Sequence, residues 1–326
     1  MREKCQNSKK LCKLKKGENM NTEEYILIEN TDINMERIKV PKFSDEELYT
    51  IQQFIEFTRH IQEIDQLFHI FKINLREILL NYELNCDDTI VRKIDLSYDE
   101  EDMIIINTLV INYISSAKTF VESIETFINK NMAEEDVKKF KVDCLSKIYD
   151  EKFSYRLLIR LRDYAQHGHL PVYMSYDKKC SFDLDQILFT PNFSHNKKIQ
   201  NEMIELRQKI YNEFGDNPRI MFTMSIAEFQ LCILKIYIYF IDLIKEKLVD
   251  LVNKMDTLIK ERPDVIYKSE DSLNGFIVYS IENKFVQCLN PKEKPLKMID
   301  KIKSDVENEF QNAKKEFEKL FKTEEN

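Results

Sequence analysis

The sequence predicts an all-α protein with small β-hairpin additions, and three observations lead to this prediction. Glycine and proline, which interrupt helices, occur only four and seven times in 326 residues. Leucine, isoleucine, lysine and glutamate are abundant. Several long segments repeat their apolar residues at helical spacing. The chain shows no internal repeat and no low-complexity linker, so one helical domain fits the sequence better than two.

Four segments are expected along the chain. The first begins with a basic stretch, residues 1–19, that carries seven Lys or Arg against two Glu and should be disordered. Translation that starts at Met20 would remove this stretch from the protein. The expected segments are a basic segment over 1–22, an N-terminal helical extension over 23–95, a helical core over 96–262, and a β-hairpin with a charged helix over 263–326.

The N-terminal extension is expected to contain one long helix. A short apolar run over 25–28 predicts a small strand before it. Ser44 and Glu47 have the spacing of a capping box, in which each side chain binds the backbone N–H of the other. The helix that starts there should run to about Leu84, with a break near Asp65.

The predicted core begins with three helices. Residues 86–101 are acidic and irregular, and residues 101–131 then place apolar side chains on one face over many turns. Further helices are expected over 133–150 and 152–167.

The rest of the chain should alternate hairpins and helices. Alternating apolar residues around a short polar turn predict one hairpin, and an Asn274–Gly275 turn predicts another. The expected elements are a hairpin over 171–188, a helix over 196–213, a long helix over 224–262, a hairpin over 264–288 and a charged helix over 296–322.

Composition excludes several classes of protein. So few glycines argue against a P-loop or a dinucleotide-binding fingerprint. The seven cysteines are dispersed and form no CxxC pair, which argues against a structural zinc site and suits reduced thiols in a cytosol. The most apolar run, Phe229–Ile244, contains Lys235 and Asp242 and is too short to span a bilayer. We therefore expect a cytoplasmic protein without a membrane segment.

The net charge of −8 means that the protein as a whole does not attract nucleic acid. Any contact with RNA must come from a local basic patch. Sequence-specific DNA binding is not expected.

A stripe of small polar residues runs along the helix predicted at 101–131: Asn112, Ser116, Thr119 and Ser123. Such side chains are unusual on the solvated face of so charged a protein. In one interpretation they bind the backbone of their own helix where two helices pack. In the other they line a cleft.

The stretch RLRDYAQHGHLPV, residues 160–172, places arginines and histidines at the end of a predicted helix. Arg162 and His167 are five residues apart, and the arginine side chain is long enough to bring its guanidinium group near the imidazole ring. Gly168 can adopt the left-handed conformation that ends a helix, and Pro171 prevents continuation. One interpretation is ordinary helix termination, with His167 favoured by the helix dipole and the arginines at the surface. The other is a functional site.

The motif Arg162-Asp163-Tyr164-Ala165-Gln166-His167 resembles that of the HEPN superfamily, an arginine and a polar residue followed by a histidine. The segments YRLLIRLRDYAQHGHLPV and INTLVINYISSAKTF look like the motif helix and the preceding core helix of one bacterial branch, over roughly residues 100–260. The resemblance implies an up-and-down helical bundle that is often a homodimer. It also implies either a metal-independent endoribonuclease of toxin–antitoxin, abortive-infection or CRISPR-linked defence, or a scaffold without catalysis that binds nucleotide, RNA or a protein.

In such a nuclease the ribose 2′-OH attacks the adjacent phosphate without metal or cofactor. His167 would move the proton, because imidazole titrates near neutrality. Arg162 would stabilise charge on the phosphoryl oxygens, and Asp163 would orient Arg162 or the partner's histidine. No nucleotidyltransferase motif accompanies the domain in this chain, so we expect any antitoxin or defence partner to be a separate protein. The supporting residues that complete the predicted site are Gln166, His169, Asn112 and Ser116. For His169 two interpretations stay open: a second proton carrier, or an exposed side chain without a role.

Overall fold

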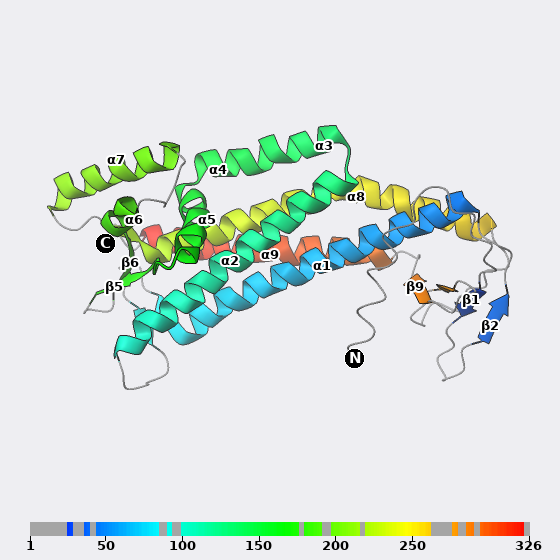
Figure 1. Ribbon diagram of the computed structural model, residues 1–326, viewed down its shortest axis with the longest axis horizontal. Helices are drawn as coiled ribbons and strands as arrows, with labels where there is room; N and C mark the ends of the chain where they lie inside the picture. The colour runs from blue at the N-terminus through cyan, green and yellow to red at the C-terminus, as the bar shows by residue number, and fades with distance from the viewer. Residues whose placement is uncertain are drawn as a thin grey trace. The chain divides into compact units, whose positions relative to one another are not determined.

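The computed structural model describes most of the chain as helices and short antiparallel strands, which confirms the all-α class with small β additions (Figure 1). The described residues are 25–28, 36–39, 44–84, 90–92, 99–175, 179–190, 197–215, 219–261, 276–279, 285–289 and 294–322. The predicted basic segment 1–22 lies outside them.

The chain divides into two compact units, and each is described by itself. Unit 1 comprises residues 1–59 and 246–299, and unit 2 comprises residues 60–245 and 300–326. Their limits fall inside long helices, away from the expected boundaries after residues 95 and 262, which stay a prediction.

The helices follow the predicted segments closely. Their bounds are α1 Asp45–Asn81, α2 Asp99–Asn131, α3 Glu134–Lys139, the π-helix η2 Phe140–Ser146, α4 Lys147–Glu151, α5 Phe153–Gln166, α6 Leu184–Phe189, α7 Lys197–Phe214, α8 Phe222–Glu261 and α9 Lys294–Lys322. The capping box of α1 is present, because the Ser44 N–H donates to Glu47 Oε2 (2.6 Å) and the Glu47 N–H donates to Ser44 Oγ (3.2 Å).

Two details of the helix prediction are wrong. Helix α1 continues through Asp65 without a break, since both sides of that residue bury apolar side chains at helical spacing. The helix expected over 133–150 contains the π-helical segment η2, whose buried residues are Phe140 and Cys144.

Unit 1 contains a four-stranded antiparallel sheet in the order β2-β1-β8-β9. Its strands are β1 Tyr25–Ile28, β2 Glu36–Lys39, β8 Phe276–Tyr279 and β9 Phe285–Leu289. The expected strand at 25–28 and the expected second hairpin are present. The predicted turn residues Asn274 and Gly275 lie outside the described residues, and the paired strands β8 and β9 are separated by residues 280–284.

Unit 2 contains two smaller antiparallel pairings. The hairpin of β3 Tyr82–Leu84 and β4 Ile90–Arg92 occupies sequence that we expected to be the end of a helix and an irregular segment. A three-stranded sheet joins β5 Tyr173–Met174, β6 Cys180–Asp183 and β7 Arg219–Met221. It contains the first predicted hairpin, but residues 184–189 form α6, which Asp183 caps through the Gln186 N–H (3.0 Å).

Aromatic side chains join α1, α2 and α8 in the core of unit 2, where these helices run side by side (Figure 1). The Phe68 ring of α1 lies 4.7 Å from the Tyr237 ring of α8 and 5.5 Å from the Phe120 ring of α2. The Phe120 and Tyr237 rings meet edge to face at 5.1 Å. Tilted and edge-to-face contacts are the favoured geometries of such pairs.

Helices α5 and α9 also contact this core. The Tyr155 ring of α5 stacks on the Phe229 ring of α8 at 5.9 Å. Helix α9 forms an ion pair from Asp300 to Lys245 of α8 (2.8 Å) and another from Glu309 to Lys72 of α1.

Among the described residues, two helices have the length and apolar composition of a membrane span: Glu101–Asn131 of α2 and Phe222–Leu258 of α8. Long core helices of water-soluble proteins have the same properties, and 44% and 56% of the two apolar windows are buried inside the structure. The run Phe229–Ile244, which by itself is too short to span a bilayer, lies within the longer apolar segment Phe222–Leu258. The cytoplasmic location stays a prediction.

Candidate functional site

The end of α5 carries the predicted motif. The His167 N–H lies 3.3 Å from the carbonyl oxygen of Asp163, and the Gly168 N–H donates to the carbonyl of Ala165 at 3.0 Å. Gly168 has a φ of +89°, the left-handed conformation that the sequence predicted. A Cβ at Gly168 would meet no atom within 4 Å, so backbone conformation alone favours glycine there.

Asn107 of α2 fixes the chain just after this turn. Its side-chain nitrogen donates to the carbonyl of Val172 (2.9 Å), and its side-chain oxygen accepts from the Val172 N–H (2.8 Å). Asn107 is 1% exposed, so water cannot replace these bonds. The segment between α5 and β5 is thereby tied to α2.

Four charged side chains meet where α2 and α5 pack together. The Lys118 Nζ atom of α2 lies 2.8 Å from Asp163 Oδ1, and Arg162 Nη1 lies 3.4 Å from the same oxygen. Arg160 Nη1 lies 3.8 Å from Asp163 Oδ2. We call Lys118, Arg160, Arg162 and Asp163 the basic cluster, because three cations share one carboxylate.

The basic cluster keeps Asp163 ionised. Partial burial acts to raise the pKa of this carboxyl, but the hydrogen bond and charge of Lys118, followed by those of Arg162, lower it below its ordinary value. Asp163 therefore accepts hydrogen bonds from both Lys118 and Arg162. Its role in orienting Arg162 or a partner's histidine stays a prediction.

His167 is exposed at the end of α5, and Gln166 beside it is exposed as well. The structure has no hydrogen bond or ion pair between His167 and Arg162, both of which it describes. The His167 side chain is therefore accessible to a ligand, whereas Arg162 forms an ion pair with Asp163.

His169 is half-buried, and its ring stacks on that of Tyr164 at 4.6 Å with an angle of 24° between the planes. An idle, solvent-exposed side chain was one of the two interpretations for this residue. The stack on Tyr164 gives it a fixed position instead.

Two residues of the polar stripe of α2, Ser116 and Thr119, bond to their own helix. Ser116 Oγ donates to the Tyr113 carbonyl (2.9 Å), and Thr119 Oγ1 donates to the Ser115 carbonyl (2.9 Å). Asn112 is exposed on the same helix. These bonds favour the interpretation in which the hydroxyls satisfy local backbone groups.

Sequence reasoning missed Lys118 and Asn107. One signal was available for Lys118, which is the first charged residue after Asp102 along fifteen uncharged positions of α2. A lone charge in such a helix indicates a specific partner. The bonds of Asn107 had no comparable signal in the sequence.

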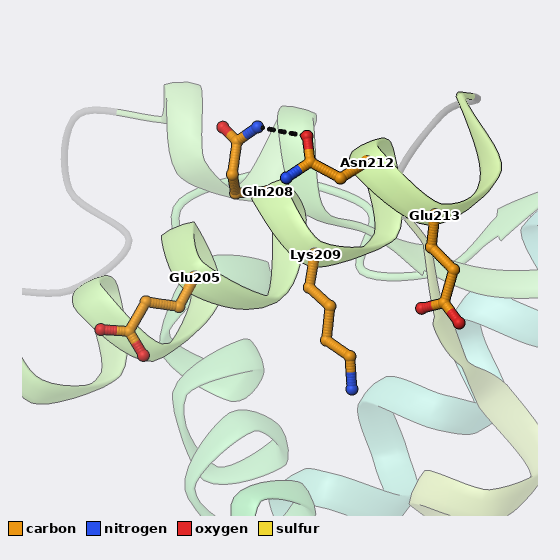
Figure 2. A pocket seen from close by; sticks show the side chains of 5 residues that line it. All are labelled: Glu205, Gln208, Lys209, Asn212 and Glu213. Atoms are coloured by element: carbon orange, nitrogen blue, oxygen red, sulfur yellow. Dashed lines mark hydrogen bonds between the residues drawn. The ribbon is translucent and has the colours of Figure 1, made fainter.

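Two hollows among the described residues of unit 2 lie apart from the predicted residues. One of about 610 Å³ lies on α7, where Lys209 is flanked by Glu205 and Glu213, and Gln208 Nε2 donates to Asn212 Oδ1 at 2.9 Å (Figure 2). Another of about 250 Å³ is lined by residues of α4, α8 and α9. Within the described ranges, no group of three His, Cys, Asp or Glu side chains is placed to hold a metal ion.

The geometry at the end of α5 thus combines an exposed imidazole with a cluster of cations on the same helix and its neighbour. Histidine can transfer a proton near neutral pH, and guanidinium and ammonium groups can bind phosphate. Comparison of the chain with protein-family models, with curated proteins and with solved structures gave no match.

Proposed function

We propose that this protein is a metal-independent endoribonuclease of the HEPN type, acting as a cytoplasmic homodimer in bacterial defence or a toxin-like stress response. One observation carries the proposal. An exposed histidine, His167, ends the helix whose last turns carry Arg160 and Arg162, and these arginines share a single carboxylate with Lys118.

The proposed chemistry assigns each group a task. The ribose 2′-OH attacks the neighbouring phosphorus, and the bond from phosphorus to the 5′-oxygen of the next nucleotide breaks. His167 takes the proton from the 2′-OH or gives one to the leaving oxygen. Arg162 donates hydrogen bonds to the phosphoryl oxygens as their charge grows. His169, Gln166, Asn112 and Ser116 support the site, and RNA is the substrate.

The test is cleavage of total RNA and tRNA by purified protein in EDTA. Wild type is compared with Arg162→Ala and His167→Ala, and His69→Ala removes an exposed histidine on α1 as the matched control. We expect cleavage by wild type and the control, and a loss of about 100-fold or more in each site variant. Equal cleavage by all four proteins would show a contaminant and contradict the proposal.

A second function is favoured by one observation, the engagement of Arg162 with Asp163 in the free protein. In that case the domain is a scaffold without catalysis that binds nucleotide, RNA or a partner protein such as a separate antitoxin. A folded wild-type protein that cleaves no RNA would favour this function.

A further inference from the structure

The basic cluster has more cationic charge than its own residues neutralise. Lys118, Arg160 and Arg162 all approach Asp163, at 2.8, 3.8 and 3.4 Å. Lys118 pairs with this carboxylate of α5 although Glu122 lies one turn further along its own helix. One carboxylate therefore faces three cations.

The cluster also has an excess of hydrogen-bond donors. One ammonium and two guanidinium groups offer more N–H donors than the two oxygens of Asp163 can accept. The Nε atoms of Arg160 and Arg162 are buried and have no hydrogen-bond partner. Buried donors without acceptors are costly, so a bound acceptor in this place would be stabilising.

Partial burial strengthens the attraction for an anion. The four side chains are between 18% and 35% exposed, with Lys118 the least exposed and Arg160 the most. Charges in such an environment are less screened than on an open surface, yet a ligand can still reach them. Guanidinium forks fit the geometry of phosphate especially well.

We propose that Lys118 and Arg160, beside Arg162, form a subsite for a phosphodiester group of single-stranded RNA, next to the group that is cleaved. In the free protein the Asp163 carboxylate stands in the place of that phosphate. RNA binding moves Lys118 and Arg160 from Asp163 to the oxygens of this phosphate, and Arg162 to those of the phosphate that is cleaved. The subsite rests on the proposed function for the identity of the ligand, but its binding does not depend on cleavage.

The test measures binding alone. A fluorescent single-stranded RNA with 2′-O-methyl groups lacks the nucleophile, and its anisotropy gives the affinity in EDTA over a range of KCl concentrations. The proteins are wild type, Lys118→Gln, Arg160→Gln, Asp163→Asn and Lys209→Gln. The last is the matched control, since it removes one positive charge from the surface of α7 between Glu205 and Glu213 (Figure 2).

We expect Lys118→Gln and Arg160→Gln each to bind about tenfold more weakly at low salt. The slope of log affinity against log salt should become shallower by about 0.7 for each phosphate that a variant no longer neutralises. Lys209→Gln should bind like wild type. Asp163→Asn should bind several-fold more tightly, because the cations no longer have a competing carboxylate.

The direction in which Asp163→Asn changes the RNA affinity shows whether the cluster binds RNA or only holds α5 against α2. If the cluster only ties α5 to α2, this substitution weakens or does not change RNA binding, and either result overturns the proposal. A wild-type protein that binds no RNA also overturns it. If RNA cleavage is lost in His167→Ala but Lys118→Gln binds RNA as tightly as wild type, the subsite is rejected and the nuclease is kept. Altered binding by the cluster variants without any cleavage rejects the nuclease and keeps the subsite.

Discussion

Asn107 and Asn112 are the same residue type on the same helix, but only Asn107 is buried. Replacing Asn107 with Ala leaves the N–H and the carbonyl of Val172 without their side-chain partner. Each buried group left unpaired costs about 1–3 kcal/mol, so we expect the free energy of unfolding to fall by at least that amount. Urea unfolding followed by far-UV circular dichroism measures the change.

Asn112→Ala is the matched control. Its side chain is exposed, so the free energy of unfolding should change by no more than about 0.5 kcal/mol. Equal losses in the two variants would contradict the structural role of Asn107.

The difference between these residues shows what could be predicted at the residue scale. The turn at His167 and Gly168 was predicted correctly because its bonds join residues three or four positions apart. The partners of Asn107 and Lys118 lie 65 and 45 positions away. Local spacing contains no information about such contacts, and therefore Asn112 was expected in the site and Asn107 was not.

At the scale of elements, Arg156 of α5 binds two other helices. Its guanidinium donates to both carboxylate oxygens of Glu202 in α7, at 3.0 Å each, and to the carbonyls of Tyr149 and Asp150 in α4. Arg156 is 5% exposed, and its removal leaves the partly buried Glu202 carboxylate, 29% exposed, without its ion-pair partner. We expect Arg156→Met to lower the free energy of unfolding by about 3–5 kcal/mol in urea titrations.

Lys198→Met tests whether burial is the reason for the large loss of stability expected in Arg156→Met. Lys198 of α7 pairs with Asp150 of α4 at 2.6 Å, but both side chains are exposed. Water and salt screen exposed pairs, which contribute little to stability, so this variant should unfold almost like wild type. A loss as large as that of Arg156→Met would mean that burial does not set the cost.

Elements were predicted best where they are long and capped. Helix α1 starts at its capping box, and α8 extends over nearly the expected range. The β3–β4 hairpin was missed because each strand has only three residues, too few for alternation to be recognised. The π-helix was missed because Phe140 and Cys144, four residues apart, also have the spacing of an α-helix.

At the scale of the whole molecule, the packed core of unit 2 should make stability sensitive to alkaline pH. Burial raises the pKa of the Cys144 thiol from about 9 to about 12, and burial followed by the charge of Glu228 raises that of Cys232 to about 12. Both thiols stay protonated in the folded state while the unfolded chain ionises above about pH 9. The stabilisation is therefore complete below pH 9 and is lost as the pH rises toward 12.

The expected loss is up to about 1.4 kcal/mol per thiol for each pH unit above 9. Urea midpoints of the reduced protein at pH 8, 9 and 10 measure it, for wild type and for Cys144→Ala, Cys232→Ala and the double variant. Each substitution also leaves a cavity, which lowers the free energy of unfolding equally at every pH. The comparison therefore uses the slope of this free energy against pH and not its value at one pH. The slope should be shallower in each single variant and shallowest in the double variant. Parallel slopes in all four proteins would show that other groups, such as surface lysines, cause the alkaline loss and that these two thiols do not contribute to it.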